Sequence, residues 1–235
     1  FDGGADNTLA NRGSISALSG TAILGSVGND LVTNNGLVTG SVLLGAGANA
    51  FDNRVGARFD SGARIELGAG NALTNNGILS PGGIGTIMDT TLIGDLVLSS
   101  SSVLEMEIGG FVPGSFDVLD ITGTVMGDGN PMEPSLVMGT VNFSFLSSFD
   151  IASEIGPGES RTLEFLTAGS PVDWMAMSYG FSCLSEGFRF DVFGQDDGGL
   201  YLQATHTVST IPAPGALLLT GIGLGLLGRR RRGTS

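Results

Sequence analysis

Two short motifs recur at fixed spacing in the amino-terminal half of this 235-residue chain. Leu44-Gly45-Ala46-Gly47 returns as Leu67-Gly68-Ala69-Gly70, and Thr33-Asn34-Asn35-Gly36 returns as Thr74-Asn75-Asn76-Gly77. Short apolar runs alternate with these turn-forming segments. A period of roughly 20 residues with short strands is typical of a β-solenoid, in which each coil buries aliphatic side chains against the next coil. Asn-Gly also suits β-hairpins, but hairpins would not explain the repeated spacing.

The pattern predicts an all-β chain with a β-solenoid repeat region over residues 1–128. Gly127-Asp128-Gly129-Asn130-Pro131 interrupts the repeats, and the chain beyond it is richer in Phe and Met. We predict that residues 129–206 form a β-rich cap over the open end of the solenoid, and a separate small β-domain of the sandwich type is the alternative. The strands expected in this part span residues 140–145, 161–166, 188–193 and 200–204, with a hairpin turn at residues 196–199.

Residues 79–125 carry a more specific order of motifs. Ser80-Pro81-Gly82 and Ile84-Gly85-Thr86 lead into Gly94-Asp95-Leu96-Val97-Leu98, and two further strand-like segments follow at residues 102–109 and 117–123. This order resembles the passenger-associated repeat of autotransporter β-helices. The resemblance implies a right-handed β-helix-like solenoid. It implies no particular activity, because that scaffold hosts adhesins, proteases and inert stalks.

Alternation within two of these segments predicts which side chains face the core. Residues two apart on a strand share a face. We therefore expect Leu104, Met106 and Ile108 to point inward, and Val103, Glu105 and Glu107 to point outward, in the segment 103–108. The same reasoning predicts that Leu119 and Ile121 are buried.

The carboxyl-terminal segment, residues 207–235, has the features of a membrane signal. Pro212-Ala213-Pro214 precedes an uncharged apolar stretch at residues 214–228, and Arg229, Arg230, Arg231 and Arg232 follow directly. We predict a short transmembrane helix over 214–228, and the arginines would keep the carboxyl terminus on the cytoplasmic side. A buried core helix that ends in a solvated basic tag is the alternative, but a soluble helix should show a polar face.

The order of these three elements resembles the PEP-CTERM sorting signal of Gram-negative bacteria. In that comparison Pro212, Ala213 and Pro214 take the position of the sorting motif, with Ala213 in place of the commoner glutamate. The resemblance implies an exosortase-type membrane transpeptidase as a partner and an inner-membrane intermediate held by the helix. Delivery to the cell surface or the extracellular space would follow. Such a tail also requires export, so we expect an amino-terminal signal peptide ahead of Phe1.

Charge and cysteine content narrow the functional classes. The chain has 23 acidic residues, ten arginines and no lysine, and its formal net charge is −13. This balance argues against nucleic acid as a partner. The glycine-rich segments lack the lysine of a phosphate-binding loop. Cys183 is the only cysteine, so no disulfide forms within the chain, and its apolar neighbours suggest a small core residue.

The chain offers few groups for catalysis or metal binding. His206 is the single histidine and is expected to lie exposed in a linker before the tail, which argues against nucleophilic catalysis and a His-based metal site. Glu105 and Glu107 form a carboxylate pair on one face, but we expect an exposed pair that nothing desolvates. Residues 28–31, 52–53 and 82–87 resemble fragments of calcium-binding repeats, without the six to eight oxygens that calcium needs.

The sequence thus predicts an exported protein with a structural or adhesive role in an extracellular matrix. We expect it not to be an enzyme and assign no catalytic residue, metal or cofactor. The resemblance of the tail implies extracellular polysaccharide as a further partner. The alternative is a polysaccharide-degrading enzyme that uses carboxylates along the solenoid. A groove with clustered acids and aromatic residues would favour the enzyme, and an even polar surface would favour the structural protein.

Overall fold

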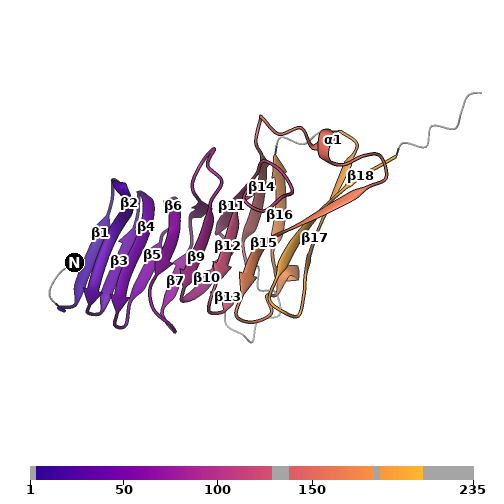
Figure 1. Ribbon diagram of the computed structural model, residues 1–235. Helices are drawn as coiled ribbons and strands as arrows, with labels where there is room; N and C mark the ends of the chain where they lie inside the picture. The colour runs from indigo at the N-terminus through magenta and orange to yellow at the C-terminus, as the bar shows by residue number, and fades with distance from the viewer. Residues whose placement is uncertain (1–3, 129–137, 183–185, 209–235) are drawn as a thin grey trace, which may run out of the picture.

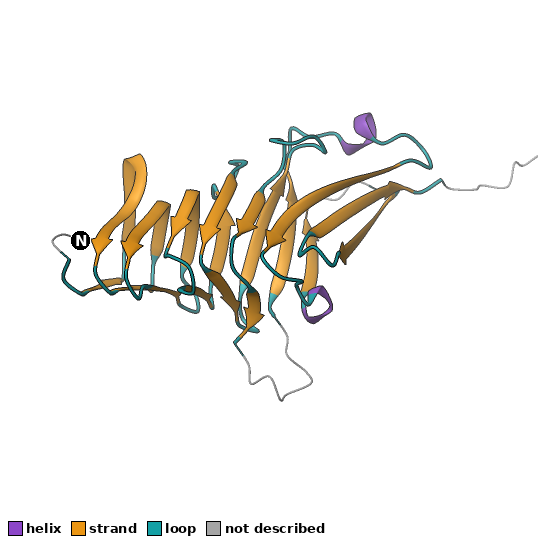
Figure 2. Cartoon of the chain, turned by 60° about the horizontal axis from the view of Figure 1, so that its bottom comes forward, coloured by secondary structure: helices purple, strands orange, loops and turns teal. Residues whose placement is uncertain are grey.

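The computed structural model describes residues 4–128, 138–182 and 186–208. These residues form an all-β structure, as predicted, in which strands follow one another from the amino-terminal end toward β18 (Figure 1). The strands are β1 Asn7–Asn11, β2 Ser14–Val27, β3 Asp30–Asn34, β4 Leu37–Ala46, β5 Ala50–Asn53, β6 Arg58–Glu66, β7 Ala72–Asn75, β8 Ile78–Pro81, β9 Asp89–Ile93, β10 Asp95–Leu98, β11 Val103–Ile108, β12 Val118–Ile121, β13 Val125–Gly127, β14 Thr140–Phe145, β15 Ser160–Ala168, β16 Ser178–Ser182, β17 Phe188–Gly194 and β18 Leu200–His206. A short helix α1, Ile151–Glu154, and a 3₁₀ turn, Trp174–Ala176, lie toward the carboxyl-terminal strands (Figure 2).

The strands lie on three sides that the chain visits in a repeating order. The first side is the sheet β1-β3-β5-β7-β10-β13, in which every pairing is parallel. The long strands β2, β4 and β6 each run along both the second and the third side. β6 pairs with β8 through its first half, on the second side, and with β9 through its second half, on the third side. Later passages use separate strands, β8, β11 and β14 on the second side and β9, β12 and β15 on the third. We call one passage around the three sides a coil.

The core consists of apolar side chains stacked from coil to coil. Each side contributes one continuous row in which paired residues lie directly above one another, and the rows are almost completely buried. Burial of this stacked apolar surface is the main favourable term that holds successive strands together. The rows are Val32, Phe51, Leu73, Leu96 and Val125 on the first side, Val38, Phe59, Leu79, Leu104 and Val141 on the second, and Val42, Ile65, Leu92, Ile121 and Ala168 on the third.

The pairing explains the two repeat spacings in the sequence. Val42 pairs with Ile65 and Leu43 with Glu66, so the two Leu-Gly-Ala-Gly motifs lie one coil apart. Thr33 pairs with Asp52, which pairs with Thr74, so the two Thr-Asn-Asn-Gly motifs lie two coils apart. The parallel pairing that the repeats predicted is therefore confirmed for the strands within residues 30–125. Leu104, Met106, Leu119 and Ile121 are each no more than 2% exposed, which confirms their predicted burial.

A row of buried asparagines fixes one corner of the stack. Asn11 donates to Asn34, Asn34 to Asn53, and Asn53 to Asn75 through side-chain amides at 2.8, 2.9 and 2.7 Å. The same amides donate to the backbone of the following corner, which satisfies polar groups that burial would otherwise leave unpaired. We call this row the asparagine ladder.

Coils approach each other closely at this corner, which explains the glycine of each Thr-Asn-Asn-Gly motif. A Cβ atom at Gly36 would lie 2.1 Å from the carbonyl oxygen of Gly13, and one at Gly77 would lie 2.3 Å from that of Ala57. Only glycine leaves room for the neighbouring backbone at such a position.

The strands beyond residue 138 continue the larger sheet. β14 pairs in parallel with β11 and β16, and β15 pairs in parallel with β12. The direction changes only at β18, which pairs antiparallel with β15 and β17. All four strands predicted in this part are present, and the turn at residues 196–199 joins β17 and β18 as a hairpin, as predicted. A cluster of phenylalanine rings, among them Phe143, Phe165, Phe181 and Phe190, packs inside this end.

Candidate functional site

Polar side chains gather on the outward face of β11, β14 and β16. Leu104, Met106 and Ile108 point into the core, so Glu105 and Glu107 of β11 point outward, as predicted. The parallel registers extend this outward face across the three strands in the rows Glu105–Asn142–Gly180 and Glu107–Ser144–Ser182.

A pocket of about 400 Å³ opens over these rows. It is lined by Ile84, Glu105, Glu107, Asn142, Ser144, Gly180, Phe181 and Ser182. Ile84 belongs to the turn between β8 and β9 and is 81% exposed. The ring of Phe181 stacks on the rings of Phe143 and Phe190, with centroids 5.4 and 5.2 Å away. The pocket therefore combines carboxylates, an amide and hydroxyls with an apolar side chain from the turn.

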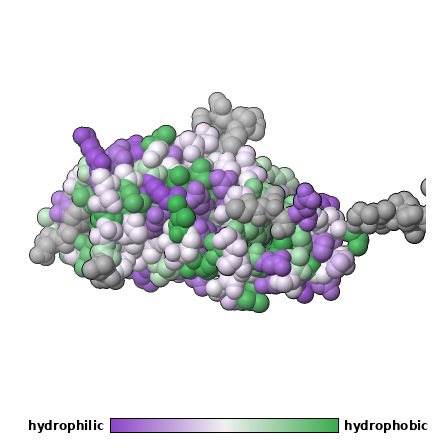
Figure 3. Space-filling view, turned by 90° about the horizontal axis from the view of Figure 1, so that it is seen from above, coloured by the Kyte–Doolittle hydropathy of each residue, from purple (hydrophilic) through white to green (hydrophobic). Residues whose placement is uncertain are grey.

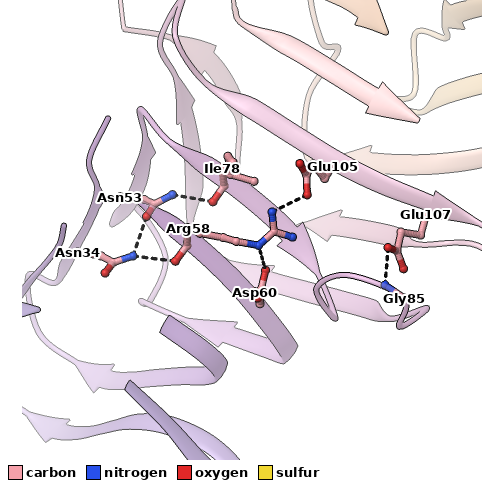
Figure 4. A network of polar contacts seen from close by, with 8 residues as sticks. All are labelled: Asn34, Asn53, Arg58, Asp60, Ile78, Gly85, Glu105 and Glu107. Atoms are coloured by element: carbon pink, nitrogen blue, oxygen red, sulfur yellow. Dashed lines mark hydrogen bonds and ion pairs between the residues drawn. The ribbon is translucent and has the colours of Figure 1, made fainter. Parts of the chain in front are cut away.

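Glu107 is buried, and the expectation that nothing desolvates the carboxylate pair was wrong for this residue. Its side chain faces outward from the sheet, yet the residue is only 6% exposed. The backbone N–H of Gly85 donates to Glu107 Oε1 at 2.5 Å (Figure 4). Glu107 Oε2 is also buried and has no hydrogen-bond partner among the described residues. An unpaired buried carboxylate oxygen is costly, so this atom strongly favours contact with a hydrogen-bond donor.

Glu105 belongs to an ion-pair network that reaches back to β6. Arg58 donates to Asp60 through Nε at 2.6 Å and to Glu105 through Nη1 at 2.7 Å (Figure 4). Burial acts to lower the pKa of Arg58, but hydrogen bonds and charges from Glu105 and Asp60 outweigh burial and raise it. Burial raises the pKa of the Asp60 carboxyl, although Arg58 acts to lower it. The directions of both pKa shifts agree with one arginine shared between the carboxylates of Asp60 and Glu105. These three groups together therefore carry an excess of negative charge.

Asp117 is hydrogen-bonded to the backbone of Glu107 and is 1% exposed. It accepts the backbone N–H of Glu107 at 2.7 Å and that of Met88 at 2.8 Å. Burial raises the pKa of the Asp117 carboxyl to about 7, against the two backbone hydrogen bonds, and the charges of Glu107 and Asp89 add to the rise. Asp117 ties the strand that carries Glu107 to the segment before β9.

Two further side chains in the pocket are available to a ligand. Asn142 and Ser144 make no side-chain hydrogen bond with any described residue. Gly180 leaves the space that Asn142 occupies, because a Cβ atom there would lie 2.3 Å from Asn142 Oδ1. The sequence pattern pointed to the two glutamates but not to Asn142 and Ser144. Their alternation with Val141, Phe143 and Phe145 is the signal that would have placed them on the outward face.

A second, more open pocket of about 480 Å³ lies on the third side. It is lined by Asp89, Thr90, Thr91, Val118, Asp120 and Thr167. The hydroxyl of Thr167 already donates to Asp120, and that of Thr90 donates to the carbonyl of Gly62. Three of its polar side chains are thus already hydrogen-bonded within the chain, so this pocket is a weaker candidate than the one at Glu107.

His206 was wrongly expected to be an exposed linker residue. It is the last residue of β18, and its ring is only partly exposed. Nδ1 lies 2.8 Å from the carbonyl oxygen of Ile155, and the ring packs on Phe188 with centroids 4.5 Å apart. The histidine thus connects β17, β18 and the end of α1. It has no carboxylate partner for base catalysis among these contacts.

The calcium-like fragments have other roles in the structure. Asp30 is 1% exposed and accepts the Asn7 amide, Asp52 pairs with Arg54, and Asn53 belongs to the asparagine ladder. Among the described residues, no three His, Cys, Asp or Glu side chains are arranged to hold a metal ion.

The predicted tail elements lie outside the described residues. This applies to Pro212, Ala213 and Pro214, to the predicted helix at 214–228, and to Arg229, Arg230, Arg231 and Arg232, as well as to Cys183. Within the described ranges, neither helical segment has the length and apolar character needed to cross a bilayer.

Comparison of the sequence with protein-family models finds no match, and comparison with curated proteins finds none either.

Proposed function

We propose that this chain is an exported β-solenoid protein with a structural or adhesive role at the cell surface or in an extracellular polysaccharide matrix. Residues 1–128 form the solenoid in this proposal, residues 129–206 close its carboxyl-terminal end, and residues 207–235 serve as the sorting tail. The role does not require catalysis, a metal or a cofactor.

The parallel pairing of successive strands on three sides is the observation that carries the structural role. Each coil hydrogen-bonds to the next along its strands and stacks three apolar side chains on those of its neighbours. Such an array is extended and stiff, and its outer face is free for contact with other molecules. The face seen in Figure 3 carries hydrophilic and hydrophobic residues interspersed along its length, which suits a surface held among hydrated polymers.

The tail sequence supports export and sorting. Pro212, Ala213 and Pro214 would form the recognised motif, residues 214–228 the membrane helix, and the four arginines the cytoplasmic end. An exosortase-type transpeptidase of the inner membrane would cleave near the motif and release the part of the chain that precedes the tail, here called the passenger, to the cell surface. The excess of acidic residues in the passenger keeps it soluble and separate from other copies.

The test separates membrane insertion from cleavage in a Gram-negative host that has a matching transpeptidase. Deletion of Arg229–Arg232 should abolish retention and processing, because these charges fix the topology. A Pro212→Ala, Pro214→Ala double variant should insert normally and stay uncleaved, because alanine is tolerated in a membrane helix but the recognised turn is lost. Fractionation reports insertion, and mass spectrometry of the mature protein reports cleavage.

A mature wild-type protein that keeps all four arginines would overturn the sorting role. The tail would then be a plain anchor, and the proposal of matrix export would lose its main support.

A polysaccharide-degrading enzyme is a second candidate, because Glu105 and Glu107 line one pocket. Two carboxylates flanking a glycosidic bond are the usual catalytic pair in glycoside hydrolysis. Glu105, however, is already engaged by Arg58. Release of new reducing ends from a polysaccharide, lost in both Glu105→Gln and Glu107→Gln, would favour this candidate over the structural role.

A further inference from the structure

Unpaired buried polar atoms cluster on one side of the molecule. Four buried side-chain atoms among the described residues have no hydrogen-bond partner. Three of them belong to neighbouring strands of the second side: Arg58 Nη2 on β6, Ser80 Oγ on β8 and Glu107 Oε2 on β11. Native proteins leave few such atoms unpaired, and each one calls for an explanation such as a functional role or a bound water or ion. Of the three, Glu107 also lines a pocket.

The charge of this pocket selects the chemistry of its ligand. Glu107 Oε2 can only accept hydrogen bonds while the carboxylate is ionised, so the ligand must donate. Glu105 and Glu107 line the pocket itself, whereas Arg58 is already shared between Asp60 and Glu105. An anionic ligand is therefore repelled. A metal ion would need more carboxylate or histidine ligands than the described residues bring together.

Size and shape fit a small polyhydroxylated ligand. A volume of about 400 Å³ lies in the lower part of the range that small-molecule sites usually have. Asn142 offers both donors and an acceptor, and the Ser144 hydroxyl can do either. Ile84 gives an apolar contact at the rim, which suits the C–H face of a sugar ring. The pocket also lies on the outside of the sheet, where a long polymer can reach it.

We propose that this pocket binds a neutral sugar unit of a polysaccharide, with Glu107 Oε2 accepting a sugar hydroxyl and Asn142 and Ser144 holding adjacent hydroxyls. The inference deepens the proposed function, because it assigns the matrix contact to one site and to uncharged glycan. The acidic pocket discriminates against uronic acid polymers.

The turn between β8 and β9 takes part in binding. Gly85 holds the other oxygen of the same carboxylate, and Ile84 beside it lines the pocket. Because Glu107 is only 6% exposed, a hydroxyl that reaches Oε2 must shift this turn outward slightly. Glycines at positions 82, 83 and 85, all with positive φ, give the turn a conformation that other residues rarely adopt. The Ile84 methyl group is thus a specific reporter of occupancy.

The experiment uses the full chain in a mild detergent with isoleucine methyl groups labelled for NMR. The probes are cellopentaose, maltopentaose and mannopentaose as neutral oligosaccharides, with oligogalacturonate and calcium chloride as charged comparisons. At least one neutral probe should shift the Ile84 signal and leave that of Ile23 in β2 unchanged, with a Kd of about 1 mM or tighter. Oligogalacturonate and calcium should not shift the Ile84 signal.

Variants connect the signal to the carboxylate. Glu107→Gln keeps an oxygen for Gly85 but replaces the free acceptor with a donor, and it should weaken binding by roughly 10-fold to 100-fold, as expected for a hydrogen bond to a charged group. Ser144→Ala should weaken it by a few-fold. Glu66→Gln is the matched control, since Glu66 is an outward glutamate on β6 that pairs with Arg64 and does not line the pocket. Thermal melting of each variant shows that it is folded.

Three outcomes would overturn the inference. These are no shift of Ile84 with any neutral probe at about 10 mM, equal binding by Glu107→Gln and the wild type, or preferential binding of calcium or oligogalacturonate. The result of the tail experiment does not depend on any of these outcomes. Failure of this pocket can therefore be told apart from failure of the export proposal.

Discussion

Asp117 is the residue at which protonation and folding are most directly linked. It accepts hydrogen bonds from the backbone of Met88 and Glu107, and it is 1% exposed. The two donors favour the carboxylate, but burial opposes it more strongly and raises the pKa to about 7. The folded protein therefore holds a proton on Asp117 over a pH range in which the unfolded chain has already lost it.

The predicted consequence is a loss of stability as the pH rises through about 7. A raised carboxyl pKa means that the folded state binds more protons, so its contribution is fully present below the unfolded pKa of about 4 and declines above it. Between pH 5 and pH 8 we expect the free energy of unfolding to fall by on the order of 2 kcal/mol on this account. Urea denaturation at a series of pH values measures this.

Asp117→Asn should be less stable than the wild type at low pH, because its NH₂ group faces a backbone donor, and should lack the decline between pH 5 and pH 8. Asp196→Asn, at an exposed turn, is the control and should retain the wild-type pH dependence. An unchanged pH profile in Asp117→Asn would assign the effect to another group.

The sequence predicted which way the side chains of β11 point, but it did not predict that an outward side chain of this strand is buried. Alternation correctly placed Leu104 and Met106 inward and Glu107 outward. Glu107 is nevertheless buried, because the turn at residues 82–88 and the Asp117 segment meet it from elsewhere in the sequence. A periodic pattern describes one strand and carries no information about a loop that folds over it.

At the scale of the element, the asparagine ladder ties successive corners together. Asn53 receives a hydrogen bond from Asn34 and donates to Asn75 Oδ1 and to the carbonyl oxygen of Ile78, at 2.9, 2.7 and 2.8 Å. It is completely buried, so its partners have no access to solvent when it is removed.

We predict that Asn53→Ala lowers the free energy of unfolding by roughly 2–4 kcal/mol, because it leaves a donor on Asn34 and an acceptor on Asn75 buried without partners. Chemical denaturation measures the loss. Asn76→Ala is the matched control, since Asn76 lies one residue beyond the ladder and is partly exposed. It should change stability by less than about 0.5 kcal/mol. Equal losses in both variants would show that the ladder adds nothing specific.

The sequence pointed to corners at these asparagines but not to the ladder. Asn-Gly and Asn-Asn-Gly predict turns because both residues tolerate turn conformations. The recurrence of Asn two residues before Gly, at Asn11, Asn34 and Asn75, was the available signal. The predicted strand at residues 140–145 was easier, since it shows clear alternation over its whole length, and the one at residues 188–193 alternates from Phe188 to Val192.

For the whole molecule, the register predicts that a complete coil is removable. Asn53 pairs with Asn75, and Leu37 and Ile78 both pair with Arg58, so deletion of residues 54–75 brings β4 next to β8 in the register that β6 occupied. After the deletion, Val38 would lie against Leu79 and Val42 against Leu92, so the rows of buried apolar side chains would stay continuous.

The chain without residues 54–75 should fold cooperatively and keep the parallel β-sheet signature in circular dichroism. Its melting temperature should fall, because it has one interface between coils fewer. Deletion of residues 60–81 is the control of equal length that cuts through strands on the second side and should not fold well. Similar behaviour of both deletions would contradict a modular stack.

The asparagine ladder also has a direction. Every amide donates toward the carboxyl-terminal neighbour, from Asn11 to Asn34 to Asn53 to Asn75. Each completed coil therefore presents an unpaired side-chain N–H toward its carboxyl-terminal neighbour, and the next coil supplies the oxygen that accepts it. A polypeptide that emerges from a pore with its amino end first grows along this polarity, since every newly arrived segment meets a template that is already complete.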